Sequence, residues 1–109
     1  RLLRERLGWP ADKLVMAFQS RFGPKEWLQP YADETIRALP GKGAKNVAMI
    51  SPGFVADCVE TLEELAIGLQ EEFLEAGGEN FAYVPCLNDD DGQAEFMANL
   101  AVRELGGWL

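Results

Sequence analysis

The sequence has 109 residues, of which 48% are hydrophobic and 26% are charged, the proportions of a soluble globular protein. Its formal net charge of −8 disfavours nucleic acid as a partner, because phosphate backbones are bound mainly by Lys and Arg. The absence of His excludes a Ser-His-Asp triad, a His-paired cysteine nucleophile and an imidazole metal site within these residues.

The predicted elements alternate between helical periodicity and apolar runs of strand length, a pattern typical of βαβ units. In chain order we expect a short helix at 2–7, a strand at 14–18, a helix at 33–39, a strand at 47–50, a long helix at 57–76, a strand at 81–84 and a helix at 93–105. Right-handed crossovers make all the strands parallel. The prediction is an α/β fold of three layers, a parallel sheet with helices on both faces, forming one domain over residues 1–109.

All three predicted strands end at one edge of the sheet, where open α/β sheets bind their ligands. The segment at 19–31, after the first strand, carries the aromatic residues Phe22, Trp27 and Tyr31. A long aromatic loop at this edge suggests the wall of a site for a flat apolar ligand. The alternative is a loop folded over the sheet edge, with its aromatic side chains in a small satellite core.

Glu60 follows the second strand and a turn at 52–54, and it lies in the first turn of the long helix. A carboxylate at that place is suited to hold a divalent cation or to accept a proton. Glu64 shares its helix face, and two like charges at this spacing attract a cation. The alternative is structural, because Asp57 and Glu60 have the spacing of a capping box and the helix dipole stabilises acidic residues in a first turn.

Two cysteines, Cys58 and Cys86, are too few for a disulfide framework and are not spaced as a metal knuckle. We expect free thiols in a reducing compartment. Cys58, near the start of the long helix, is placed to bind a soft metal or to react, and Cys86 at the third strand exit has the same two interpretations. The alternative for both is a small buried hydrophobic residue. The segment at 88–91 is expected to form a turn and the N-cap of the last helix.

Three blocks of sequence carry a resemblance to a known family. They are residues 18–24 with Trp27 and Leu28, residues 52–64, and residues 85–88. In these blocks, and from about Leu14 to Leu105, the chain resembles the C-terminal part of ferrochelatases, enzymes that insert ferrous iron into protoporphyrin IX to form haem. The resemblance implies a chelatase-type fold of two similar α/β domains, of which this chain holds most of the second. It also implies that ferrous iron and a porphyrin are the substrates.

The resemblance implies a role for particular residues. Glu60 matches the family's essential carboxylate, implicated in metal delivery or in removal of the pyrrole protons. The implied metal ligands are Glu60, Glu64 and Cys58, and the implied porphyrin-binding residues are Phe54, Trp27, Ser20 and Phe22. The chain departs from the family at Ala66 and Gly68, where other members often continue a row of acidic residues. The family's catalytic His belongs to an upstream part.

Partners and location follow as expectations. We expect the N-terminal domain of the same enzyme as a partner, no nucleic acid, and inactivity of these residues by themselves. Because no apolar run of about eighteen residues and no leader is found, we expect a cytosolic protein, with a peripheral contact at the inner membrane left open. We expect no iron–sulfur cluster, since no Cys-rich tail follows. Two alternatives stay open: a chelatase for another tetrapyrrole or metal, and a non-catalytic module that binds a porphyrin or a partner.

Overall fold

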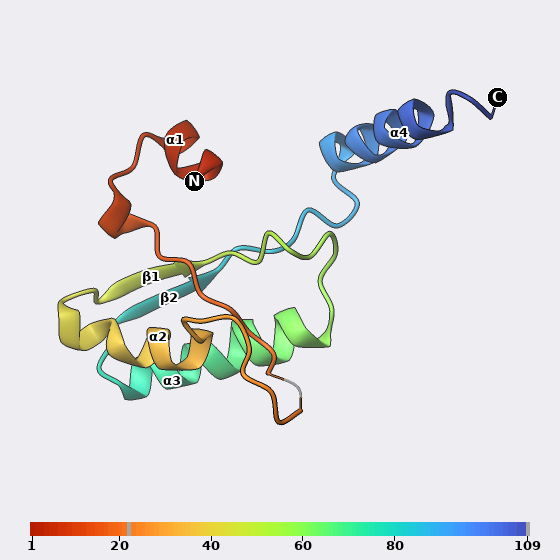
Figure 1. Ribbon diagram of the computed structural model, residues 1–109. Coiled ribbons are helices and arrows are strands. Elements are labelled where there is room, and N and C mark those ends of the chain that lie inside the picture. The colour runs from red at the N-terminus through yellow and green to blue at the C-terminus, as the bar shows by residue number, and fades with distance from the viewer. Residues whose placement is uncertain (22, 109) are drawn as a thin grey trace.

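The computed structural model describes residues 1–21 and 23–108. Its centre is a parallel pair of strands, β1 (Asn46–Met49) and β2 (Asn80–Tyr83), in a register that pairs Asn46 with Asn80. On one side of this pair lie α2 (Ala32–Ala38) and a long helix composed of η3 (Glu60–Leu69) and α3 (Gln70–Glu75) (Figure 1). The long helix connects β1 to β2, so the predicted βαβ unit and the α/β class are confirmed.

The core lies between the strand pair and these helices. Its buried hydrophobic residues are Ala32, Ile36, Leu65, Leu69 and Phe73. Alternate strand residues point toward this core, while the residues between them are exposed, because successive side chains of a strand point to opposite faces. Among the described residues, helices therefore cover one face of the sheet. A second helical layer, which the three-layer prediction requires, stays a prediction.

Phe73 is the centre of this core and needs a glycine beside it. Its ring is fully buried and lies 6.0 Å from the ring of Phe81, centroid to centroid. A Cβ atom added at Gly78 would lie 2.2 Å from Cε1 of Phe73, far inside van der Waals contact. The glycine after the long helix therefore does more than end it, since it leaves the space that the ring occupies.

The long helix differs in type from a plain α-helix. Its first ten residues, Glu60–Leu69, form a π-helix, and only Gln70–Glu75 are α-helical. The π-helix has i→i+5 hydrogen bonds, is rare, and often occurs at functional sites. Apolar periodicity predicts a helix at 57–76, but it does not say which of the two types forms.

The predicted strand at 14–18 is wrong. In place of a strand the structure has an extended segment with one isolated parallel bridge, between Phe18 and Tyr31. Phe18 donates from its backbone N–H to Pro30 and accepts from Ala32, at 2.8 and 2.9 Å. Val15 and Met16 stay exposed, and none of the described strands pairs with the segment. An apolar run predicts burial, but it does not supply the partner that a strand requires.

The two ends of the chain form arms that project from this body (Figure 1). The N-terminal arm contains α1 (Leu2–Leu7) and the 3₁₀ turn η1 (Ala11–Lys13), and the C-terminal arm contains α4 (Asp91–Leu105). A further 3₁₀ turn, η2 (Pro40–Lys42), follows α2 within the body. The radius of gyration of 16.8 Å exceeds the roughly 13 Å of a compact domain of this length, because the arms extend outward.

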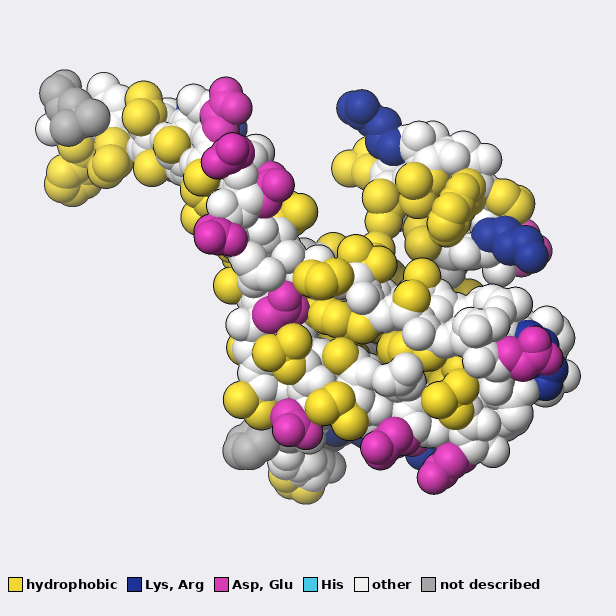
Figure 2. Space-filling model, turned by 180° about the vertical axis from the view of Figure 1, so that it is seen from behind, with side chains coloured by type: hydrophobic (Ala, Val, Ile, Leu, Met, Phe, Trp, Pro, Cys, Tyr) yellow, Lys and Arg dark blue, Asp and Glu magenta, His cyan; other side chains and the backbone are white. Residues whose placement is uncertain are grey.

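The helices of the arms begin and end within two residues of the predicted bounds, but none of the arms' described residues is buried. Gly8 ends α1 in the left-handed conformation, and the Asp90 carboxylate caps α4 by accepting from Gly92 N–H at 2.9 Å. Exposed hydrophobic residues on the arms include Leu2, Trp9, Phe96, Met97, Val102 and Trp108, and Figure 2 shows hydrophobic side chains on both. None of the described helices is long and apolar enough to cross a bilayer.

Candidate functional site

The site lies where both strands end and the long helix begins. The segments that follow β1 and β2 lie side by side here. Val84 N–H donates to Met49 O at 2.9 Å, and Asn88 N–H donates to Val55 O at 3.1 Å. This is the sheet edge at which the sequence predicts a ligand site.

Asp57 is the centre of a hydrogen-bond network at this edge. Its Oδ1 accepts from Thr61 Oγ1 at 3.0 Å and from the Tyr83 hydroxyl at 2.9 Å. Its Oδ2 accepts from Asn88 Nδ2 at 2.9 Å and from the backbone N–H of Cys86 at 3.2 Å. The Asn88 bond above all, aided by the others, holds the pKa of the Asp57 carboxyl well below its usual range against the opposing effect of burial. Asp57 therefore stays ionised and fully bonded, and it does not form the predicted capping box with Glu60.

Tyr83 extends this network toward β1. Its hydroxyl lies 2.9 Å from Ser51 Oγ and 3.6 Å from Cys86 Sγ. Burial raises the pKa of the Tyr83 phenol, so the hydroxyl keeps the proton that it donates to Asp57. Cys86 is thus a partly buried thiol within a polar cluster, and both of its interpretations stay predictions.

The two predicted metal-binding glutamates lie together on the exposed face of the π-helix. Between them lies Gln19, whose Nε2 donates to the Glu64 carboxylate and, at 3.2 Å, to the backbone carbonyl of Glu60. Cys58 Sγ lies 3.8 Å from Oε2 of Glu60. Within the part of the chain that the structure describes, no Lys or Arg lies at ion-pair distance from either glutamate. The two carboxylates are therefore not neutralised by a basic side chain.

These glutamates line one wall of a groove of about 830 Å³. The helix wall consists of Glu60, Glu64, Gly68, Leu69 and Glu72, and the opposite wall comes from Phe18, Gln19, Ser20, Arg21, Trp27, Ala32 and Asp33. The groove thus brings predicted porphyrin-binding residues, Ser20 and Trp27, opposite predicted metal ligands. Gly68, where other members of the family that the chain resembles often have an acidic residue, contributes no side chain to this wall.

Other predicted site residues lie elsewhere. Phe54 is in the turn after β1, where its N–H donates to Ser51 O at 3.0 Å, and it does not line the groove. Cys58 is also outside the groove lining, and Phe22 lies outside the described residues. Among the described residues, no three or more His, Cys, Asp or Glu side chains gather closely enough to hold a metal ion. The metal-ligand and porphyrin-contact assignments stay predictions.

Charged side chains that contact one another connect the loop of the opposite wall to α2 and α3. Arg21 Nη2 lies 2.8 Å from Oδ2 of Asp33, and its guanidinium lies 4.3 Å from the centre of the Tyr31 ring. Arg37 contacts the same Asp33 oxygen at 3.2 Å and Glu72 at 3.1 Å. Each exposed pair contributes little stability by itself, but the shared carboxylate joins loop, α2 and α3 in one arrangement.

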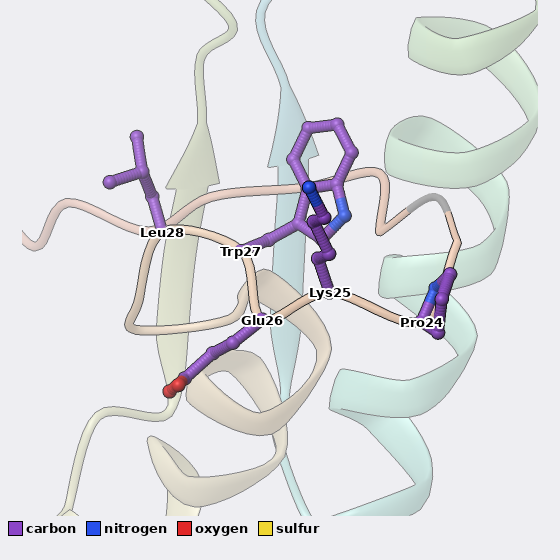
Figure 3. A pocket seen from close by; sticks show the side chains of 5 residues that line it. All are labelled: Pro24, Lys25, Glu26, Trp27 and Leu28. Atoms are coloured by element: carbon purple, nitrogen blue, oxygen red, sulfur yellow. The ribbon is translucent and has the colours of Figure 1, made fainter.

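The outer part of this loop forms a second hollow, lined by residues 24–28 with a volume of about 730 Å³. Figure 3 shows Trp27 and Lys25 rising from the same side of the loop and Glu26 pointing away from them. Ser20, nearer the helix, has a φ of 63°, a left-handed conformation uncommon for a residue with a side chain. The loop is therefore an irregular, specifically bent segment.

Sequence reasoning missed two residues of this region. Gln19 lies inside the first block of the resemblance but has no chemical pattern of its own. Asp57 has the spacing of a local cap, whereas its partners Tyr83 and Asn88 are 26 and 31 residues away. The only available signal was that each residue follows an apolar run, at 14–18 for Gln19 and at 47–50 for Asp57.

Known proteins resemble the chain along its whole length. The sequence profile of the family described as Ferrochelatase matches residues 1–105. A ferrochelatase of Allorhizobium ampelinum is 57% identical over 109 residues, which are all of this chain and 32% of that protein. Ferrochelatases of Rhizobium meliloti and Brucella ovis are each 56% identical over 109 residues, which are 32% and 31% of those proteins. The chain spans about a third of the length of these relatives. Since the profile and the relatives cover every residue of the two walls and of the strand edge described above, the chain belongs to the ferrochelatase family.

Proposed function

We propose that this chain is part of an enzyme that inserts ferrous iron into protoporphyrin IX to form haem, and that it supplies the carboxylate wall of the site. The observation that carries the proposal is the groove in which Glu60 and Glu64 lie opposite Ser20 and Trp27. The relatives named Ferrochelatase, 56–57% identical over all of this chain, support the reaction.

The reaction needs two kinds of group, and the side chains of the groove would supply them. A porphyrin loses two pyrrole protons as the ferrous ion enters its centre, so a base and a place for the cation are required. Glu60 would accept a proton or hold the incoming ion, because its exposed carboxylate has no basic partner in the described structure. Trp27 would supply a flat apolar contact for the macrocycle, and the Ser20 hydroxyl a hydrogen bond to a polar edge of it.

Gln19 would assist by orientation. Its amide group has two N–H donors, and they are directed at Glu64 and at the backbone of Glu60. A neutral donor holds the Glu64 side chain in the groove without removing its negative charge. A Lys at that position would neutralise the charge that attracts the cation.

We also propose that the N-terminal domain of the same enzyme completes the fold and the site. The chain covers about a third of the length of its relatives, and none of the described residues of its two arms is buried. The outer face of its sheet carries the small residues Ala48 and Ala82. Small residues allow close packing of a second helical layer, which would give the three-layer arrangement. The cytosolic location, a peripheral contact at the inner membrane and the absence of an iron–sulfur cluster stay predictions.

The test uses a chimera in which this chain replaces the 109 residues that it matches in the ferrochelatase of Allorhizobium ampelinum. Metal insertion is followed by porphyrin absorbance and fluorescence. The chimera should insert ferrous iron, and Glu60→Gln should lower its kcat by roughly 100-fold or more, the usual contribution of a positioned acid or base. Glu63→Gln is the matched control, because Glu63 is exposed on the same helix but does not line the groove.

Two outcomes would count against the proposal. Normal insertion by the Glu60→Gln chimera would remove Glu60 from the reaction. Porphyrin binding without insertion by the chimera, when the parent relative inserts metal under the same conditions, would favour the non-catalytic module instead.

A further inference from the structure

The Asp57 carboxylate accepts hydrogen bonds from four donor groups, yet Asp57 does not line the groove. It precedes Glu60 by three residues, where a local cap is expected. Its acceptor oxygens instead receive donors from the end of β2 and from the loop that follows it, at Tyr83, Cys86 and Asn88. Asp57 therefore joins the start of the π-helix to the other strand of the sheet.

The segment between Asp57 and Thr61 is itself tightly bonded. The Thr61 side chain is fully buried, and its hydroxyl accepts from Cys58 N–H at 2.9 Å while lying 3.0 Å from Oδ1 of Asp57. The Asp57 backbone N–H in turn donates to Oδ1 of Asn88 at 2.8 Å. Glu60 lies inside this turn, so its backbone has little freedom to move independently of Asp57.

We infer that Asp57 is a positioning residue that anchors the first turn of the π-helix to the end of β2 and thereby sets where the Glu60 carboxylate enters the groove. The inference rests on the proposed function of Glu60. A carboxylate is needed at this place because all four partners donate to it. An amide at the same place would turn its own N–H₂ group toward two of these donors, and the turn would shift to avoid them.

The experiment is a double-mutant cycle in the chimera, with Asp57→Asn, Glu60→Gln and the combined variant. Small displacements of a reacting group cost up to about 100-fold in rate, so Asp57→Asn should lower kcat by roughly 10- to 100-fold. The porphyrin KM should change by less than about threefold, because the groove walls are intact. In the Glu60→Gln background, Asp57→Asn should lower kcat by less than about twofold further, because Asp57 acts through Glu60.

Other outcomes overturn the inference. The first is a normal kcat for folded Asp57→Asn, in a chimera whose kcat Glu60→Gln does lower. The second is that Asp57→Asn lowers kcat by the same factor with Glu60 present and with Glu60→Gln, which would indicate a general structural role. A normal kcat for Glu60→Gln refutes the proposed function of Glu60 and this inference together, whatever Asp57→Asn does. Circular dichroism and porphyrin binding check folding.

If Asp57→Asn does not fold, Tyr83→Phe decides the matter. This variant removes only the hydroxyl that donates to Asp57, at 2.9 Å, and keeps the aromatic ring. It should lower kcat by roughly threefold to tenfold, and this loss should again disappear in the Glu60→Gln background. An unchanged kcat for Tyr83→Phe, or an equal loss in both backgrounds, overturns the inference.

Discussion

The body and the arms of this molecule are built from similar residues but differ in what they bury. In the body, Phe73 is 0% exposed, whereas in the C-terminal arm Phe96 of α4 is 59% exposed. Both are aromatic residues on helices with an apolar face, so the difference comes from their neighbours. The long helix packs on α2 and on the strand pair, while α4 has no such partner among the described residues. Burial thus has two requirements: an amphipathic sequence, and a neighbouring element that covers its apolar face.

The largest expected effect comes from removing the two aromatic rings in turn. Phe73→Ala should cost about 3–5 kcal/mol of unfolding free energy, in the chain alone and in the chimera, because it leaves a cavity in the core. Phe96→Ala should cost less than about 0.5 kcal/mol in the chain alone. In the chimera the Phe96→Ala cost should rise above about 1 kcal/mol, because the N-terminal domain is proposed to cover α4. Urea denaturation measures all four values, and an equal cost of both substitutions in the chain alone would contradict the distinction between body and arm.

A smaller effect is expected from adding a methyl group beside the core. Gly78→Ala places a Cβ atom 2.2 Å from the Phe73 ring, and overpacking of this kind costs about 1–3 kcal/mol. Gly41→Ala is the matched control, because a Cβ there meets no atom within 4 Å. Its effect should stay within about 0.5 kcal/mol. Equal stability of the two variants in urea would show that the ring of Phe73 is free to move aside.

The third prediction concerns the edge of the body, which is held by a charge as well as by apolar packing. The folded state lowers the pKa of Asp57, chiefly through the Asn88 bond, so the stabilisation is present above the ordinary pKa of about 3.9 and is lost as the pH falls below it. The chimera should therefore lose unfolding free energy between about pH 5 and about pH 3. Asp57→Asn should lose less over the same range in urea titrations at each pH. Parallel losses in the two proteins would exclude Asp57 as a source of the acid sensitivity.

Much of the body was predictable because its signals are local. The strands at 46–49 and 80–83 have short apolar runs, and the expected helix at 33–39 is α2 within one residue. The segment at 14–18 shows the limit of such signals. It has the same apolar character, but whether an extended segment becomes a strand depends on a neighbour that the run itself does not specify.

The candidate site was predictable in part, for the same reason. Glu60 and Glu64 were expected on one helix face, and the structure places both in one groove. The opposite wall of that groove could not be read from their spacing, since Gln19 reaches Glu64 across 45 residues. The apolar pattern of the long helix also did not predict that its first ten residues form a π-helix.

The residues alone determined where most helices and strands form, that a helix ends before Gly8 and another is capped within 88–91, and which family the chain resembles. These properties depend on side chains within a few positions of one another. Only the tertiary structure decided that Asp57 bonds to Tyr83 and Asn88, that Gly78 makes room for Phe73, and that the arms project from the body. Each of these depends on which distant segments come together, because hydrogen bonds and close packing act over a few ångströms in space whatever the separation along the chain.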